Sequence, residues 1–242
     1  MNGVQHEQEV LQDVKVELPE LTDQKVEELV QVFVDSRHLF ERFMKNVVDT
    51  FELEPGLNTN HNPVIYTVKS RIKNADHLRD KIRRKWAEGI ELTPHNLFEK
   101  ITDLAGVRVI HMYQDQFQHI HKLIDSQDWV LNEQAVAYSW DPEATDFFKG
   151  FDLLPKIKPS YYTSIHYVVK PKPTEFVCCE IQVRTLFEEI WGEIDHTINY
   201  PHQTDNIACR EQLRVLSKLV STGTRLADSI FRTHEDANKA RE

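Results

Sequence analysis

The spacing of the apolar residues changes several times along this chain, and these changes restrict the folds that it can adopt. From Thr22 to about residue 54 the apolar residues recur every three or four positions, as on one face of a helix, and Pro55-Gly56 ends the pattern. Short runs rich in β-branched and aromatic residues follow, and further helical stretches separate them. Strands interleaved with helices, and helices at both ends, predict an α+β fold in which helices flank a mixed β-sheet.

The expected elements follow from these patterns. Strands are predicted over residues 64–68, 107–110, 129–139 (with a polar turn), 164–169 and 176–183. Helices are predicted over 71–85, 93–102, 116–126, 186–198 and 206–231, and a loop over 141–159. With only 7 Gly and 10 Pro in 242 residues, no stretch has the composition of a linker. We therefore expect a flexible segment over 1–20, a single domain over 21–235 and a tail over 236–242.

The charge balance and the cysteine content exclude several classes of protein. Lys and Arg number 29 and Asp and Glu number 39, which gives a net charge of −10. This balance argues against general binding to duplex DNA, which requires a surplus of basic residues. Three cysteines without a C-x-x-C pair provide neither a disulfide framework nor a zinc site. No apolar run approaches the ~18 residues of a membrane span, and the start carries no signal pattern, so we expect a cytoplasmic protein without a membrane partner.

Two carboxylates fall in apolar surroundings. Asp103 comes just before a predicted strand, and Glu180 lies within another, where alternation places it on one face with Gln182 and Arg184. A carboxylate in such a place is costly unless it is paired or binds a cation. One carboxylate on each of two strands could hold Mg²⁺, which takes one or two protein carboxylates and substrate phosphates. A structural ion pair is the alternative.

Basic residues gather between 71 and 85. Arg71 and Lys73 lie at a strand-to-helix junction, where backbone N–H groups at a helix start favour anions, and Lys81 follows two turns later. A polyphosphate would suit this group. Residues 79, 83 and 84 are also arginines, but a charge run on a helix is usually a solvated face, and this is the favoured interpretation for these three.

A third group lies in the loop that enters the strand at 164. Lys158 precedes it, and alternation places Tyr162, Ser164 and His166 on one face. A tyrosine at a loop tip can stack on a nucleobase, which is worth ~1–3 kcal/mol in single-stranded nucleic acids. A core tyrosine is the alternative.

Taken together, these segments resemble a known family. Residues 68–73 (VKSRIK), 103–108 (DLAGVR), 162–166 (YTSIH) and 180–185 (EIQVRT) are similar, in this order, to the synthetase domain of the RelA/SpoT alarmone enzymes. The similarity spans about residues 64–200. The long enzymes place a hydrolase domain ahead of this region, but only about 60 residues precede it here and the chain contains no His-Asp dipeptide. The resemblance is therefore to the small, synthetase-only alarmone synthetases.

The resemblance implies a nucleotidyltransferase-like fold and transfer of the β,γ-diphosphate of ATP to the ribose 3′-hydroxyl of GDP or GTP. It assigns the ATP phosphates to Arg71, Lys73 and Lys81, and Mg²⁺ to Asp103 and Glu180, with Glu180 close enough to accept the hydroxyl proton. It assigns the acceptor base to Tyr162 and the rest of the acceptor to three further residues, Lys158, His166 and Gln182.

One departure leaves the acceptor open. The family usually carries Asn-Gly before the stacking tyrosine, where this chain has Ser160-Tyr161. Glycine permits positive φ and close approach of a ligand, so Tyr161 must reshape the loop. Toxic relatives with a similar ATP side modify the 3′ end of tRNA or an adenine nucleotide, and a catalytically silent nucleotide- or RNA-binding module is a further alternative.

The apolar stripes of the first and last helices predict self-association. Residues 33–48 and 213–226 carry more apolar side chains than a small sheet needs. We expect a homo-oligomer, a dimer or tetramer, as for the small synthetases that the chain resembles. In the alternative, both stripes cover the sheet of a monomer.

Overall fold

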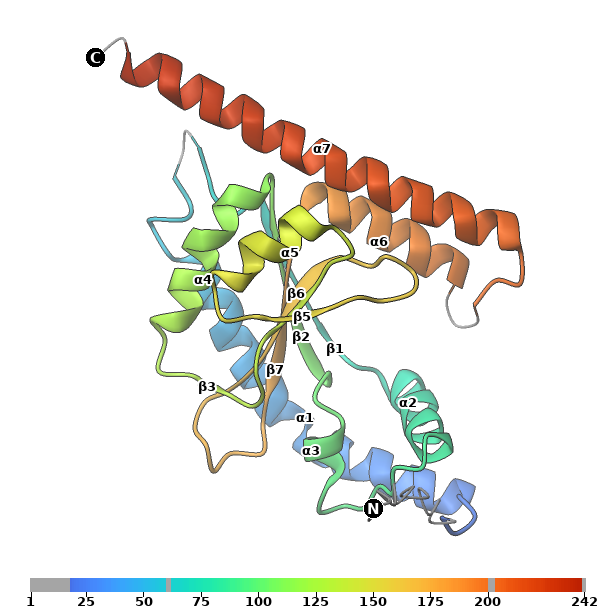
Figure 1. The fold of residues 1–242 in the computed structure, drawn as a ribbon. Coiled ribbons are helices and arrows are strands. Elements are labelled where there is room, and N and C mark those ends of the chain that lie inside the picture. The colour runs from blue at the N-terminus through green and yellow to red at the C-terminus, as the bar shows by residue number, and fades with distance from the viewer. Residues whose placement is uncertain (1–17, 60–61, 200–202, 241–242) are drawn as a thin grey trace, which may run out of the picture.

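The computed structural model describes residues 18–59, 62–199 and 203–240 (Figure 1). Most of the segment expected to be flexible, residues 1–17, lies outside this part of the chain. The neighbouring Pro19 is held in place, because its carbonyl accepts a hydrogen bond of 3.0 Å from the indole N–H of Trp86.

A mixed β-sheet forms the centre of the molecule, as the sequence predicted. Its strands are β1 Thr67–Ile72, β2 Ala105–His111, β3 Val130–Leu131, β4 Val136–Tyr138, β5 Leu154–Lys156, β6 Ser164–Lys170 and β7 Cys179–Thr185. The strand order is β1-β2-β7-β6-β4-β5, and β3 also pairs with β6. The central pair, β2 and β7, is parallel, while β1 and β6 run antiparallel to their neighbours β2 and β7.

Helices flank the sheet and extend beyond it at both ends of the chain (Figure 1). They are α1 Asp23–Glu52, α2 Ala75–Ala87, α3 Leu97–Lys100, α4 Phe117–Asp125, α5 Pro142–Lys149, α6 Leu186–Asn199 and α7 Ile207–Lys239, with a short 3₁₀ turn at Gln114–Gln116. None of the helices in the described part of the chain is long and apolar enough to cross a lipid bilayer.

Helix α1 covers the apolar face of the sheet. It begins where predicted, since the Thr22 hydroxyl accepts a hydrogen bond from the Lys25 N–H and caps the helix. Its buried stripe packs against β1, β2 and β7, which turn residues such as Val109 and Val183 toward it. Because side chains alternate along a strand, the polar residues of β2 and β7 face the other way. That second face carries the candidate site.

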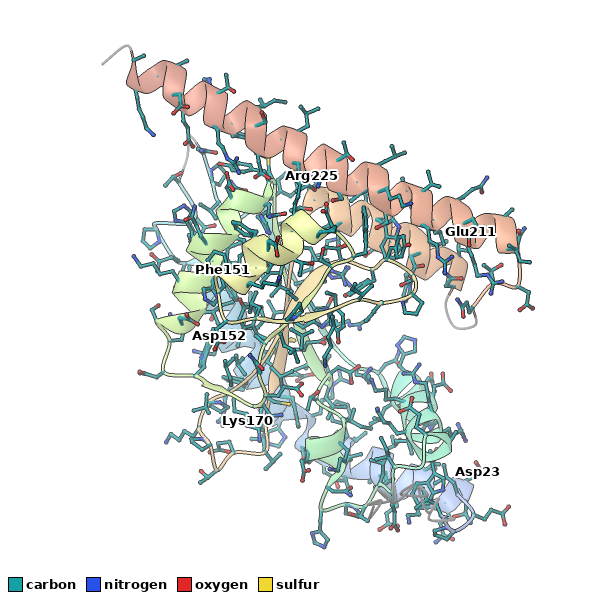
Figure 2. All side chains as sticks on the ribbon, in the orientation of Figure 1. Asp23, Phe151, Asp152, Lys170, Glu211 and Arg225 are labelled. Atoms are coloured by element: carbon teal, nitrogen blue, oxygen red, sulfur yellow. The ribbon has the colours of Figure 1, made fainter. Side chains whose placement is uncertain are left out.

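Helix α7 lies along the outside of α6, on the other side of the molecule from the start of α1 (Figure 1). Arg225 of α7, labelled in Figure 2, pairs with Asp141 at 2.8 Å and with Glu143 at 3.0 Å, and so ties α7 to the start of α5. The helix continues to Lys239 instead of ending near Phe231, so the first residues of the predicted tail are helical.

Further local predictions were wrong, among them the helix at 93–102, of which only Leu97–Lys100 is helical. The predicted strand at 64–68 begins only at Thr67, because the N–H groups of Val64 and Ile65 both bond to the Leu57 carbonyl and not to a neighbouring strand. The predicted loop at 141–159 contains α5 and β5. The signal was present, since Asp141 caps α5 and a proline follows it at the first helical position.

The packing of α1 can be tested with two valines one turn apart. Val30 is 4% exposed and Val34 is 46% exposed. Val30→Ala removes buried methyl groups and leaves a cavity, so it should lower the free energy of unfolding by about 2 kcal/mol. Val34→Ala should change it by less than about 0.5 kcal/mol. Urea unfolding measures both values, and equal losses would contradict the placement of the buried stripe.

Candidate active site

A cavity of about 910 Å³ opens on the polar face of the sheet. Strands β1, β2 and β7 contribute its floor, and α2 and α6 border it. Six of the nine predicted site residues line this cavity: Arg71, Lys73, Asp103, Tyr162, Glu180 and Gln182. The other three each contact one of these six: Lys81 contacts Asp103, Lys158 contacts Tyr162, and His166 contacts Glu180. A smaller cleft of about 490 Å³, between α1 and residues 127–129, contains none of the nine.

Asp103 pairs with two lysines, one that precedes α2 in the sequence and one that lies within this helix. Its Oδ2 atom lies 3.0 Å from Lys73 Nζ and 3.2 Å from Lys81 Nζ. The backbone N–H of Lys73 donates to the Leu104 carbonyl, which extends the β1–β2 pairing and brings Lys73 beside Asp103. Asn74 then caps α2, and this helix carries Lys81 back to the same carboxylate.

The two lysines keep Asp103 ionised. Burial works to raise the pKa of Asp103, but the two ammonium groups outweigh it and hold that pKa below its ordinary value of 3.8. Burial also lowers the pKa of Lys73, and Asp103 offsets only part of this effect. The second oxygen, Oδ1, is buried and has no hydrogen-bond partner in the described part of the chain. A buried carboxylate oxygen without a donor suits a cation ligand, so this residue fits Mg²⁺.

Glu180 is held in a chain of hydrogen bonds on β7 and β6. Its Oε1 accepts from His166 Nδ1 at 3.0 Å, and its Oε2 accepts from Gln182 Nε2 at 2.7 Å. Burial works to raise the pKa of Glu180, but the bonds from these two side chains outweigh it and keep the pKa below 4.5. Glu180 is therefore a carboxylate at neutral pH, with its orientation fixed from both sides.

Tyr162 completes this chain. Its hydroxyl lies 2.9 Å from His166 Nε2 and accepts a hydrogen bond from Arg184. One neutral tautomer of His166 satisfies every bond: Arg184 donates to the Tyr162 oxygen, Tyr162 donates to Nε2, and Nδ1–H donates to Glu180. The Lys158 ammonium lies over the Tyr162 ring, 4.2 Å from its centre. A base that stacks on that side of the ring must therefore displace a flexible lysine side chain.

Three cations from three strands converge on one buried glutamate of α6. Glu189 is 4% exposed and pairs with Lys69 at 2.9 Å, with Arg108 at 2.8 Å and with Arg184 at 3.4 Å. Helix α6 can approach Arg184 because residue 192 is glycine: a Cβ there would lie 2.7 Å from an Arg184 nitrogen. These contacts dock α6 at the edge of the cavity.

The arginines of α2 differ from one another. Arg79 is held by Glu27 and Asp76 at 2.6–2.8 Å on the side of α1, as a structural surface residue. Arg83 and Arg84 line the cavity together with Arg71, although Arg83 also pairs with Asp23. Arg83 and Arg84 are exposed, as the solvated-face interpretation expects, and they also border the cavity, whereas Arg79 is partly buried against α1.

Tyr161 has a positive φ, which glycine adopts more readily than other residues, and this explains why glycine is usual at this position. Its φ is +63°, in the left-handed region that costs a residue with a side chain about 1 kcal/mol. Its ring stacks on Trp140, with centroids 5.4 Å apart and planes at 22°. The cationic groups of Arg214 and Lys218 lie 5.7 and 5.9 Å from its centre. Tyr161 is thus packed against its own protein.

Sequence reasoning missed three residues that organise the cavity. Arg184 shares a face with Glu180 and Gln182, a pattern that pointed to it without giving it a role. Arg108 lies opposite Gln182 in the parallel register, which a single sequence does not reveal. Glu189 lies on α6, and no pattern in the local sequence indicates that this side of the helix faces the sheet.

Residues 70–205 match the family described as the region found in RelA/SpoT proteins. The chain belongs to the RelA/SpoT family. This match covers more than half of the 242 residues and includes nearly all of the cavity, so the resemblance noted in the sequence is confirmed.

Individual relatives agree with the family assignment. The chain is 29% identical over 176 residues to the GTP pyrophosphokinase YwaC of Bacillus subtilis, covering 69% of this chain and 75% of YwaC. It is 26% identical to the GTP pyrophosphokinase YjbM of the same organism, covering 81% and 82%. The crystal structure of the small alarmone synthetase 1 from Bacillus subtilis superposes with a TM-score of 0.64 at 22% identity, over 87% of this chain and 99% of that one. This RelA/SpoT member therefore has the predicted fold.

The docking of α6 gives a stability prediction with a matched control. Glu189→Gln leaves three converging cations without their charge partner, and should lower the free energy of unfolding by roughly 3 kcal/mol at pH 7. Glu193 also accepts from Arg108, but its side chain is 59% exposed, so Glu193→Gln should cost less than about 1 kcal/mol in the same urea titration.

The pH dependence adds a second readout. Burial works to raise the pKa of Glu189, but Lys69 and Arg108 outweigh it and keep the pKa below 4.5. A depressed carboxyl pKa stabilises the fold above the unfolded pKa, and that stabilisation is lost as the pH falls through the folded pKa. The difference between wild type and Glu189→Gln should therefore shrink below pH 4.5, whereas a constant difference would contradict the ion-pair account.

Proposed function

We propose that this chain is an ATP-dependent pyrophosphokinase that transfers the β,γ-diphosphate of ATP to the ribose 3′-hydroxyl of GDP or GTP, in the cytoplasm where these nucleotides occur. The observation that supports this most is the cavity that joins the lysine-bound Asp103 to the hydrogen-bonded Glu180. One carboxylate faces a basic wall suited to a triphosphate, and the other faces an aromatic and polar wall suited to a nucleoside.

The donor side is assigned to the basic wall. Lys73 and Lys81 share one Asp103 oxygen, so one of them can turn to a phosphate oxygen while the other stays paired with the carboxylate. Arg71, Arg83 and Arg84 add guanidinium groups along the same wall. Positioning and charge neutralisation provide most of the rate in reactions of phosphoryl type.

Asp103 and Glu180 would hold Mg²⁺. The unpartnered Oδ1 of Asp103 supplies a free ligand atom, and the Asp103 charge lies near enough to Glu180 to work toward a higher pKa of that second carboxyl. Bound Mg²⁺ would neutralise phosphate charge during the transfer. The side chains around this site would orient ATP and keep the carboxyl groups of Asp103 and Glu180 ionised next to it.

The acceptor side is assigned to Lys158, Tyr162, His166 and Gln182, with Glu180 as the proton acceptor. The 3′-oxygen attacks the β-phosphorus of ATP, the bond between this phosphorus and the oxygen bridging to the α-phosphate breaks, and AMP leaves with that oxygen. The proton of the 3′-hydroxyl passes to Glu180, which His166 and Gln182 hold in place. Tyr162 would stack on the guanine once the Lys158 side chain moves toward the acceptor phosphates.

Tyr161 favours a nucleotide acceptor over the end of a tRNA. A terminal base would need an open face of the Tyr161 ring, yet that ring stacks on Trp140 and lies near two cations. We keep tRNA, adenine nucleotides and a silent binding module as outcomes of the test that follows.

The test compares acceptors and variants in one assay of AMP release. The wild-type chain with ATP and Mg²⁺ should release AMP when GDP or GTP is present. Asp103→Asn and Glu180→Gln should each lower turnover at least about a hundredfold, because each removes a charge from the reacting centre. Asp152→Asn, at an exposed residue that does not line the cavity (Figure 2), should leave turnover unchanged.

Other outcomes identify the alternatives. AMP release only with deacylated tRNA or ATP as acceptor would replace the guanosine nucleotide, and no AMP release with any acceptor would favour the silent module. More than about a tenth of wild-type turnover in a fully folded Glu180→Gln protein would remove Glu180 from the chemistry. Thermal melting checks that each variant is folded.

We also propose that the chain self-associates through α6 and α7. The stripe of α1 packs against the sheet within the monomer, so the sequence argument from that helix does not hold. Leu213 and Val220 of α7 are likewise covered. The outer sides of α6 and α7, however, carry large apolar residues that are 38–66% exposed: Phe187, Ile190, Ile194, Ile198, Ile207, Val215, Leu219, Leu226 and Ile230. Such a concentration on two adjacent helices is typical of an interface.

Light scattering tests this proposal. The wild-type chain should have at least twice the mass of one 28.5 kDa chain at micromolar concentration. Leu219→Glu places a charge at a residue that is 64% exposed and should shift the protein toward the monomer. Val34→Glu makes the same change on α1, outside the patch, and should leave the mass unchanged. A wild-type mass of one chain would contradict self-association.

A further inference from the structure

The loop that carries Lys158 and Tyr162 contacts the sheet through side chains, since the Tyr162 hydroxyl bonds to His166 and Arg184 and Lys158 lies over the Tyr138 ring. Residues 157–163 lie between β5 and β6 outside any strand, and a turn in which the Tyr161 N–H donates to the Lys158 carbonyl at 2.9 Å shapes them. This loop, which we call the acceptor loop, presents two of the residues assigned to the acceptor. Two carbonyls of its backbone, at Pro159 and Tyr161, accept hydrogen bonds from outside the sheet.

Helix α7 provides these hydrogen bonds through two polar side chains one turn apart. The Ser217 hydroxyl donates to the Tyr161 carbonyl at 2.8 Å, and Arg214 Nε donates to the Pro159 carbonyl at 3.2 Å. Ser217 is 4% exposed, and its oxygen also accepts from Trp140 Nε1 at 2.8 Å. Because Trp140 donates to the Ser217 oxygen, the single hydroxyl proton of Ser217 is directed at the acceptor loop.

The hydrogen bond from Ser217 also helps to hold Tyr161 at a positive φ, which it would not adopt by itself. A left-handed residue with a side chain persists only where its surroundings fix it. Here Trp140 does two things: it stacks on the Tyr161 ring, and it donates to the serine that binds the Tyr161 carbonyl. The peptide group after Tyr161 leads directly to Tyr162, so its orientation sets where the Tyr162 ring lies.

We propose that Ser217 is a positioning residue for the acceptor substrate, acting from α7 through the Tyr161 carbonyl on Tyr162 and Lys158. This inference rests on the proposed function and adds to it a residue outside the cavity that serves only one of the two substrates. The ATP side is built on β1, β2 and α2, which have no part in this contact.

Steady-state kinetics with each substrate varied in turn test the proposal. Ser217→Ala should raise the KM for GDP about tenfold, since a lost hydrogen bond to a positioned carbonyl frees the loop. The KM for ATP should change less than twofold. Ser217→Thr keeps the hydroxyl and should restore most of the affinity for GDP. Arg214→Gln, at an exposed position that does not threaten folding, should raise the KM for GDP by about threefold.

Ser221→Ala is the matched control. Ser221 also lies on α7 and its hydroxyl also bonds to a buried acceptor, but that acceptor is the Asp141 carboxylate at the start of α5, not the acceptor loop. The variant should leave both KM values unchanged. If Ser221→Ala raises the KM for GDP as much as Ser217→Ala does, the effect is merely structural and the proposal fails.

Two further results separate this proposal from the proposed function. An active wild-type enzyme whose KM for GDP does not change in Ser217→Ala and Arg214→Gln overturns the positioning role alone, as does an equal rise in both KM values. A wild-type chain that neither releases AMP nor binds GDP in equilibrium dialysis overturns the proposed function, and the positioning role falls with it.

Discussion

The site depends on the parallel pairing of β2 with β7 at the centre of the sheet. This register sets Gly106 opposite Glu180 and Arg108 opposite Gln182, so that charged and polar side chains of two distant segments share one face. The opposite face stays apolar and packs on α1. Since α6 starts directly after β7, the same pairing also determines where Glu189 meets the arginines of the sheet. A change in this register by one residue would turn the site face into the core face.

Electrostatics explain how an acidic chain can present a basic cavity. The net charge is −10, yet the wall made by β1 and α2 gathers lysines and arginines around Asp103. Paired in this way, the lysines can stay near one another, because Asp103 offsets their repulsion. The cation–carboxylate arrangement is thus built into the fold, which lowers the cost of ordering the side chains when a substrate binds.

The sequence predicted the elements better than the contacts between them. Helix α1, its Thr22 cap and the buried side of α2 follow from local periodicity, and the structure contains them. The four family motifs led to residues that meet in one cavity although up to about 110 positions separate them. The roles of Arg184, Glu189 and Ser217 could not be found in this way, because they arise from contacts across the sheet and between helices. Tyr161 was noted as a departure from the family pattern, but its stacking on Trp140 depends on where α5 begins, in a segment predicted to be a loop.

The central claim is that this cavity moves a diphosphate and not a single phosphate. The most direct test uses ATP labelled with ³²P at the β-phosphorus, together with unlabelled GDP and Mg²⁺. Attack of the 3′-oxygen on the β-phosphorus predicts that the label moves to the guanosine product while the AMP carries none. If the label stays on ADP, the γ-phosphate alone has been transferred, and attack at the β-phosphorus is contradicted.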